Sequence, residues 1–225
     1  MVAMLYCLGM IVFTRRSKLL FSSVFILVAL VLPTSSVEAD SLNQSVTFSV
    51  NPKYDDLNRT HLVGTLRVIS SHAYFYIDQE SWTRLLAQDQ TKFLDNIQRL
   101  AEEFDNRIYP QLTTFWGSEA TPGLDHDPRV TIVIENLKQG YGGYFDTKNS
   151  YSRSDVSDSN EREIIFIADY AIGTEYTKIF LAHEFQHLIS QNQKDFLQNV
   201  PEQIWLNELR SEYTSTFLGY NQPYQ

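Results

Sequence analysis

The chain has 225 residues, of which 43% are hydrophobic and 20% are charged. These fractions are ordinary for a globular protein, so the chain is able to bury a core and is not disordered as a whole. Its formal net charge of -9 argues against a nucleic-acid partner, because binding to phosphates needs a basic surface. Cys7 is the only cysteine, so a framework of disulfides is excluded.

The N-terminus has the pattern of a signal peptide. Arg15, Arg16 and Lys18 precede an apolar run over residues 19–32, and Ala39 supplies a small residue for cleavage. We therefore expect residues 1–39 to be removed, the protein to be exported, and no membrane association after cleavage. A membrane anchor is the alternative, but the run is short compared with the roughly 20 residues that span a bilayer. Residues 1–39 hold three basic and one acidic side chain, so the mature chain would carry a net charge of -11.

Residues 40–80 are predicted to form a β region. Apolar residues alternate at Val46, Phe48 and Val50, and two further strands are expected at 62–69 and 73–77. A predicted catalytic domain follows over residues 81–225. It begins with a long helix whose apolar residues recur at spacings of three and four, which marks a face that packs on a core. These residues are Phe93, Ile97, Leu100, Phe104 and Ile108.

Two buried strands and two helices are predicted next. Val130–Ile134 and Ile164–Ile167 are short β-branched runs, which are typical of strands covered on both faces. The helices are expected over residues 175–193 and 201–219, and the second has a proline at a position tolerated in a first helical turn.

The first of these helices contains the pattern His-Glu-x-x-His at residues 183–187. Because residues four apart lie one above the other on a helix, His183 and His187 can point at one ion. Zn²⁺ accepts imidazole and carboxylate ligands, and a catalytic site keeps one position for water. Glu184 is then the candidate general base, which removes a proton from that water.

A third protein ligand has to come from elsewhere, because no histidine follows His187. Glu208 and Glu212 lie four apart and share a face of the last predicted helix. Two neighbouring carboxylates repel unless a positive partner lies near them, and a zinc ion with its imidazoles is such a partner. We assign Glu208 as the third ligand, and Glu212 as the acceptor that orients His183.

Residues 183–187 together with Trp205-Leu206-Asn207-Glu208 resemble the gluzincins, the thermolysin-like class of zinc metallopeptidases. A closer resemblance is to the hyicolysin-like group of secreted neutral metallopeptidases, and it extends over roughly residues 120–215. It implies an α+β, zincin-like fold, in which a twisted, mostly antiparallel sheet packs on the His-Glu-x-x-His helix and a following helix carries the third ligand. Leu209 departs from these families, which usually have glycine after the ligand glutamate.

The same resemblance implies a donor for the developing oxyanion beyond the third ligand. Tyr213, Tyr220 and Tyr224 are the candidates, since histidine is lacking there. The chain ends 17 residues after Glu208, so we expect the domain to be truncated at its C-terminus. The favoured function is an exported zinc peptidase that acts on proteins or peptides. The alternatives are an inactive or truncated zincin-fold module that binds peptide or cell-surface ligands, and a structural protein with an accidental motif.

Two weaker patterns leave a choice open. Gly143 and Tyr144 are candidates for a wall along which a peptide substrate lies, although a glycine turn is favoured. Asp125 and Asp127, and the polar stretch 150–160, are candidates for Ca²⁺. A solvated turn is favoured for them too, because the glycine and distal glutamate of a calcium loop are absent.

Overall fold

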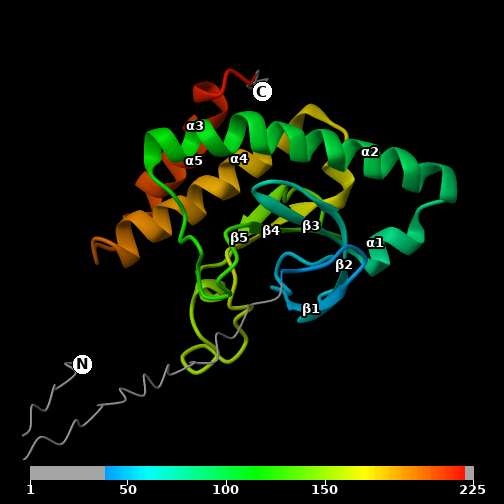
Figure 1. Ribbon diagram of the computed structural model, residues 1–225, viewed down its shortest axis with the longest axis horizontal. Helices are drawn as coiled ribbons and strands as arrows, with labels where there is room; N and C mark the ends of the chain where they lie inside the picture. Colours follow the sequence, from blue (N-terminus) through cyan, green and yellow to red (C-terminus); the bar gives the residue numbers. More distant parts are fainter. Residues whose placement is uncertain (1–38, 221–225) are drawn as a thin grey trace, which may run out of the picture. The chain divides into compact units, whose positions relative to one another are not determined.

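The computed structural model describes residues 39–220, and the predicted signal peptide therefore lies outside the described residues except for Ala39 (Figure 1). The strands are β1 (Ser45–Ser49), β2 (His61–Ile69), β3 (Ala73–Asp78), β4 (Val130–Glu135), β5 (Gly143–Phe145) and β6 (Ile164–Ala168). The α-helices are α1 (Gln79–Arg84), α2 (Ala87–Glu103), α3 (Tyr109–Trp116), α4 (Glu175–Ser190) and α5 (Ile204–Phe217). Within residues 39–220, no helix has both the length and the apolar character needed to cross a membrane.

The six strands form one mixed sheet in the order β1-β2-β3-β4-β6-β5. Neighbours pair antiparallel at β1/β2, β2/β3 and β5/β6, whereas β3/β4 and β4/β6 pair parallel. The sheet was expected to be mostly antiparallel; three of its five pairings are antiparallel, and the two central ones are parallel. Parallel neighbours need long crossovers, and the helices α1 to α3 supply one between β3 and β4.

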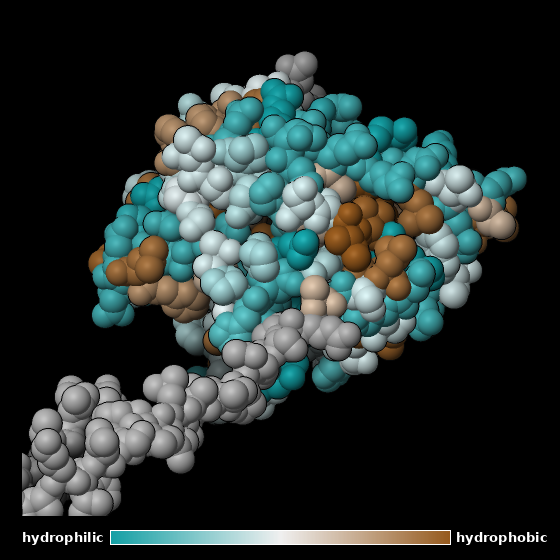
Figure 2. Space-filling model, viewed as in Figure 1, coloured by the Kyte–Doolittle hydropathy of each residue, from teal (hydrophilic) through white to brown (hydrophobic). Residues whose placement is uncertain are grey.

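The central strands are buried on both faces, because alternate side chains point to opposite sides of the sheet. Phe75, Ile132 and Ile165 point to the side that packs on α2, α3 and α4. Tyr76 and Phe166 point to the other side, into a second apolar cluster with residues of β1 and β2. Figure 1 shows the helices gathered on one face of the sheet, and Figure 2 shows a mostly hydrophilic surface over α2.

The predicted helices form with different ends and internal breaks. The long helix is interrupted by a π-helical turn at Phe104–Ile108, and α3 resumes with Pro110 in its first turn. The helix that begins at Glu175 continues after Ser190 as the π-helical segment η4 (Gln191–Phe196). The last helix begins at Ile204 rather than at Pro201, because Gln203 keeps an extended backbone.

The structure bears on two further expectations from the sequence, the glycine-rich segment and the domain boundary. The glycine-rich segment forms the short edge strand β5 rather than only a turn. The boundary predicted near residue 80 falls in α1, and strands from both sides of it belong to one sheet. The division into a β region and a catalytic domain stays a prediction.

Phe104→Ala tests the packing between the helices and the sheet. Phe104 is fully buried, and its ring lies edge-on to Phe185 of α4 at 5.0 Å between centroids. The substitution is expected to lower the free energy of unfolding by about 3–5 kcal/mol, because it leaves a cavity. Phe115→Ala is the control, since Phe115 is 57% exposed, and it is expected to cost less than about 1 kcal/mol. Urea unfolding measures both; equal losses would contradict this account of the core.

Candidate metal centre

Helix α4 holds the two histidines at the boundary between core and solvent. Leu181, Ala182, Phe185 and Leu188 are buried against the sheet and the other helices. His183 and His187 lie on another side of the helix, and their side chains keep 19% and 13% of their surface exposed. The apolar residues thus fix the helix, while the imidazoles stay accessible.

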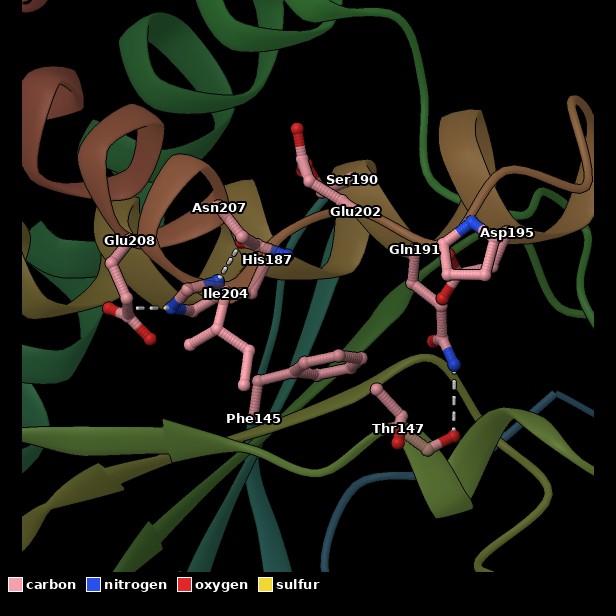
Figure 3. A pocket seen from close by; sticks show the side chains of 11 residues that line it. Phe145, Thr147, His187, Ser190, Gln191, Asp195, Glu202, Ile204, Asn207 and Glu208 are labelled. Carbon is pink, nitrogen blue, oxygen red and sulfur yellow. Dashed lines mark hydrogen bonds and ion pairs between the residues drawn. The ribbon is translucent and has the colours of Figure 1, made fainter.

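The structure brings His183, His187 and Glu208 together. The two Nε2 atoms are 3.1 Å apart, and Glu208 Oε2 lies 3.6 Å from His183 Nε2 and 3.7 Å from His187 Nε2. Among the described residues, this is the one group of three such side chains with ligand atoms within 4.8 Å of one another. Figure 3 shows the contact of Glu208 with His187 across the two helices.

These distances fit a zinc ion. Nitrogen ligands at about 2.0–2.1 Å from a tetrahedral zinc stand about 3.3–3.4 Å apart, and a carboxylate oxygen at a similar radius stands about as far from each of them. The observed separations are within a few tenths of an ångström of these values. Two imidazoles and one carboxylate also match the donor types that zinc prefers, and they leave a position for water.

Helix α5 also supplies polar atoms that orient His187. Asn207 Oδ1 lies 2.5 Å from His187 Nδ1, and Ser211 Oγ lies 3.1 Å from the same nitrogen. Ser211 Oγ is itself bonded to Gln186 Oε1 at 2.6 Å, so the imidazole is held by a buried network. No role was assigned to Asn207 or Ser211 from the sequence, although their four-residue spacing beside Glu208 is a signal.

Glu212, predicted to accept a hydrogen bond from His183, lies beside that histidine without making the bond. Its Oε1 is 3.7 Å from His183 Nδ1, which is a charge contact longer than a hydrogen bond. Burial, and after it the proximity of His187, lowers the pKa of His183 to about 4. The imidazole is therefore neutral near pH 7, and a neutral imidazole is the form that binds metal.

Glu184 is buried between α4 and the edge strand β5. Burial, followed by the charges of Glu208 and Glu212, raises the pKa of Glu184 to about 8, while a backbone hydrogen bond from Phe145 acts in the opposite direction. A carboxyl with a pKa raised to this range is suited to both accepting and donating a proton near neutral pH. A cation beside it would favour the charged form.

Gly143 is the point at which β5 approaches Glu184. A Cβ atom at position 143 would lie 2.9 Å from Glu184 Cγ and 2.8 Å from the carbonyl oxygen of Phe166, so only glycine fits without a shift. Tyr144 points to the other face, where its ring stacks on Phe166 and its hydroxyl donates to Glu135 at 3.0 Å. Only the backbone of Tyr144 is left to face the site.

A pocket of about 300 Å³ is lined by two of the candidate ligands, His187 and Glu208 (Figure 3). Its apolar wall is formed by Phe145 and Ile204, and its acidic side chains are Asp195, Glu202 and Glu208. The lining residues are Phe145, Thr147, His187, Ser190, Gln191, Asp195, Pro201, Glu202, Ile204, Asn207 and Glu208. A side chain of a bound molecule therefore has a space beside the candidate metal position.

Tyr213 and Tyr220, two of the tyrosines predicted to help the oxyanion, do not line this pocket. Tyr220 is buried, and its hydroxyl donates to Glu103 of α2 at 2.8 Å. Tyr213 lies on the exposed side of α5, near Phe217, and Tyr224 falls outside the described residues. The oxyanion donor is thus not assigned to Tyr213 or Tyr220.

The carboxylates considered for Ca²⁺ in the sequence have partners within the protein. Asp125 accepts a hydrogen bond from the backbone of Asp127 at 3.0 Å, which is the geometry of a turn. Asp155 accepts from Ser152 at 3.0 Å, and Asp158 pairs with Lys148 at 2.7 Å. The favoured interpretation of both segments as turns agrees with these contacts.

Comparison with known proteins supports a metallopeptidase family. No protein-family model matches the chain. The chain is similar to the neutral metalloprotease ShpI of Staphylococcus hyicus, with 32% identity over 126 residues. The match covers 48% of this chain and 28% of that protein, so the chain corresponds to less than a third of its length.

Ser211→Ala tests the network that holds His187. Ser211 is fully buried, and removal of its hydroxyl leaves Gln186 Oε1 without its donor. We expect a loss of about 1–3 kcal/mol in the free energy of unfolding, because a buried polar atom loses its partner. Chemical denaturation measures it, with Ser157→Ala at an exposed position as a control that is expected to stay within about 0.5 kcal/mol. A neutral Ser211→Ala would mean that the network does not hold the helices together.

Proposed function

We propose that this chain is part of an exported zinc-dependent peptidase with a zincin-like fold, of the gluzincin class and hyicolysin-like group. The observation that carries the proposal is the group of His183, His187 and Glu208, whose ligand atoms come within 4.8 Å of one another from two separate helices. The similarity to a neutral metalloprotease supports the metallopeptidase part of this proposal.

His183, His187 and Glu208 would hold the ion in this proposal. Asn207 and Ser211 fix the ring of His187 through Nδ1, and Glu212 attracts Nδ1 of His183. Contacts of this kind set the tautomer and the orientation of a ligand imidazole, and they usually change metal affinity by about 10–100-fold.

Zinc in this position would lower the pKa of a bound water toward about 7 and polarise the carbonyl of the substrate. Glu184 accepts the proton of the attacking water and then donates it to the leaving amine. Its burial against Gly143 keeps the carboxyl poorly solvated, which raises its affinity for the proton that it has to carry.

Protein or peptide chains are the proposed substrates. Strand β5 lies at the edge of the sheet, next to Glu184, and its outer side has backbone groups that no strand of residues 39–220 pairs with. An extended peptide can pair with such an edge and thereby place a carbonyl near the ion. Gly143 and Tyr144 would contribute through their backbone, since the ring of Tyr144 is buried on the opposite face.

A module that binds peptides without cleaving them is the second candidate. It is favoured by the position of Tyr220, whose hydroxyl is engaged by Glu103 instead of facing the candidate ligands. Such a module would keep the zinc and the peptide-binding edge, but it would lack a donor for the oxyanion.

Metal content and proteolysis separate these functions. We expect the purified protein to contain one zinc per chain by elemental analysis and to cleave an unfolded protein such as casein. A chelator should abolish the cleavage, and added zinc should restore it, because the water is activated by the ion. Stoichiometric zinc without turnover would favour the binding module, and the absence of zinc would overturn both.

The variants Glu184→Gln and His187→Ala separate the role of the general base from that of a metal ligand. Glu184→Gln is expected to retain zinc and to lose at least about 100-fold in turnover, since only the proton acceptor is removed. His187→Ala is expected to lose both zinc and turnover, because it removes a ligand. Glu175→Gln is the matched control on the same helix, since its side chain is 82% exposed, and it should leave both unchanged. An active Glu184→Gln variant would show that another group is the base.

A further inference from the structure

A second cavity, of about 590 Å³, lies between the loop that follows α3, the start of β6 and η4. Two acidic side chains, Glu119 and Glu163, line it, and none of its described lining residues is basic. The lining residues are Ser118, Glu119, Ala120, Thr121, Gly123, Leu124, Ser150, Glu163, Asn192, Phe196 and Leu197. None of them belongs to the candidate zinc site.

Both carboxylates are buried and incompletely satisfied. Glu119 is 1% exposed; its Oε1 accepts from the hydroxyl of Tyr109 at 2.9 Å, while Oε2 has no hydrogen-bond partner within residues 39–220. Glu163 is 4% exposed, and its Oε2 likewise has no partner in that range. Buried polar atoms are nearly always paired, so orphaned carboxylate oxygens on two residues that line the same cavity point to a missing partner.

The loop that follows α3 passes close to the side chain of Glu163. Gly123 has a φ of +68°, and a Cβ atom at this position would lie 1.7 Å from Glu163 Oε2. Only a residue without a side chain lets the backbone come this close to the carboxylate. The same loop is tied to η4, because the side chains of Asn192 and Gln193 both donate to the carbonyl oxygen of Ser118.

The charges around the cavity are predominantly negative. Burial, followed by the charges of Asp125 and Glu119, raises the pKa of Glu163 to about 7. Burial also raises the pKa of Glu119. Arg162, which precedes Glu163 in the sequence, has its guanidinium paired with Asp40. A cation in the cavity would offset this excess of negative charge.

We propose that Glu119 and Glu163 bind a Ca²⁺ ion that fastens the loop after α3 to β6 and η4. The available donors are all oxygens, which excludes the soft or nitrogen-rich environment that zinc favours. Ca²⁺ tolerates irregular coordination by carboxylates, backbone carbonyls and several waters, and the volume of the cavity leaves room for water ligands. The ion would stabilise the segment that follows the histidine helix without taking part in hydrolysis.

Thermal unfolding of the zinc-loaded protein with and without Ca²⁺ tests the site. Saturating Ca²⁺ is expected to raise Tm by about 5–10 °C, because a ligand that binds only the folded state stabilises it. Glu163→Gln and Glu119→Gln should each abolish most of this shift. Asp155→Asn is the matched control, in the other acidic stretch, and should keep the full shift. No shift in the unmodified protein, or a shift lost only in Asp155→Asn, would overturn the proposal.

Terbium luminescence gives a second measurement, which begins with the unmodified protein. Tyr109 donates to Glu119, so Tb³⁺ bound there should emit when the tyrosine is excited, and Ca²⁺ should compete the emission away. Glu163→Gln should weaken Tb³⁺ binding by at least about tenfold, as expected when an anionic ligand of a hard cation is lost. Emission that is absent, or equally strong in Glu163→Gln, would contradict a site at these two carboxylates. Zinc content should be the same in all variants, which separates this proposal from the peptidase function.

Discussion

The contact between α4 and α5 is the constraint on which the candidate site depends. His183 and His187 come from one helix, and Glu208, Asn207 and Ser211 come from the other. A carboxylate and two imidazoles brought this close need a cation or a proton between them to be stable. The buried hydrogen-bond network around His187 holds α5 against α4. The packing of the two helices therefore determines where Glu208 lies.

The sheet determines the other side of the site. Strand β5 forms the edge next to α4, and Gly143 allows its backbone to touch the side chain of Glu184. The same contact removes water from Glu184 and raises its pKa. The open edge of β5 and the poorly solvated carboxyl of Glu184 thus lie at the same contact between β5 and α4. Both suit the hydrolysis of an extended peptide.

The proposed zinc and Ca²⁺ sites lie around the same helical unit, α4 with η4. The first joins α4 to α5, and the second would join η4 to the loop after α3. The chain is acidic, with 27 acidic and 18 basic residues, and it has no disulfide to restrain its loops. Bound cations would offset negative charge and cross-link segments distant in sequence, as disulfides do in many exported proteins.

The sequence by itself determined what depends on neighbours along the chain. The spacing of His183 and His187 places them on one helix face, and the β-branched runs at 130–134 and 164–167 become buried strands, because both follow from local periodicity. Only the tertiary structure decided the parallel pairing at the centre of the sheet, the burial of Tyr144 on the opposite face, and the meeting of Glu119 with Glu163 around one cavity. These features depend on crossovers and on contacts between segments tens of residues apart. The hydrophobic pattern of a sequence does not specify which distant segments come into contact.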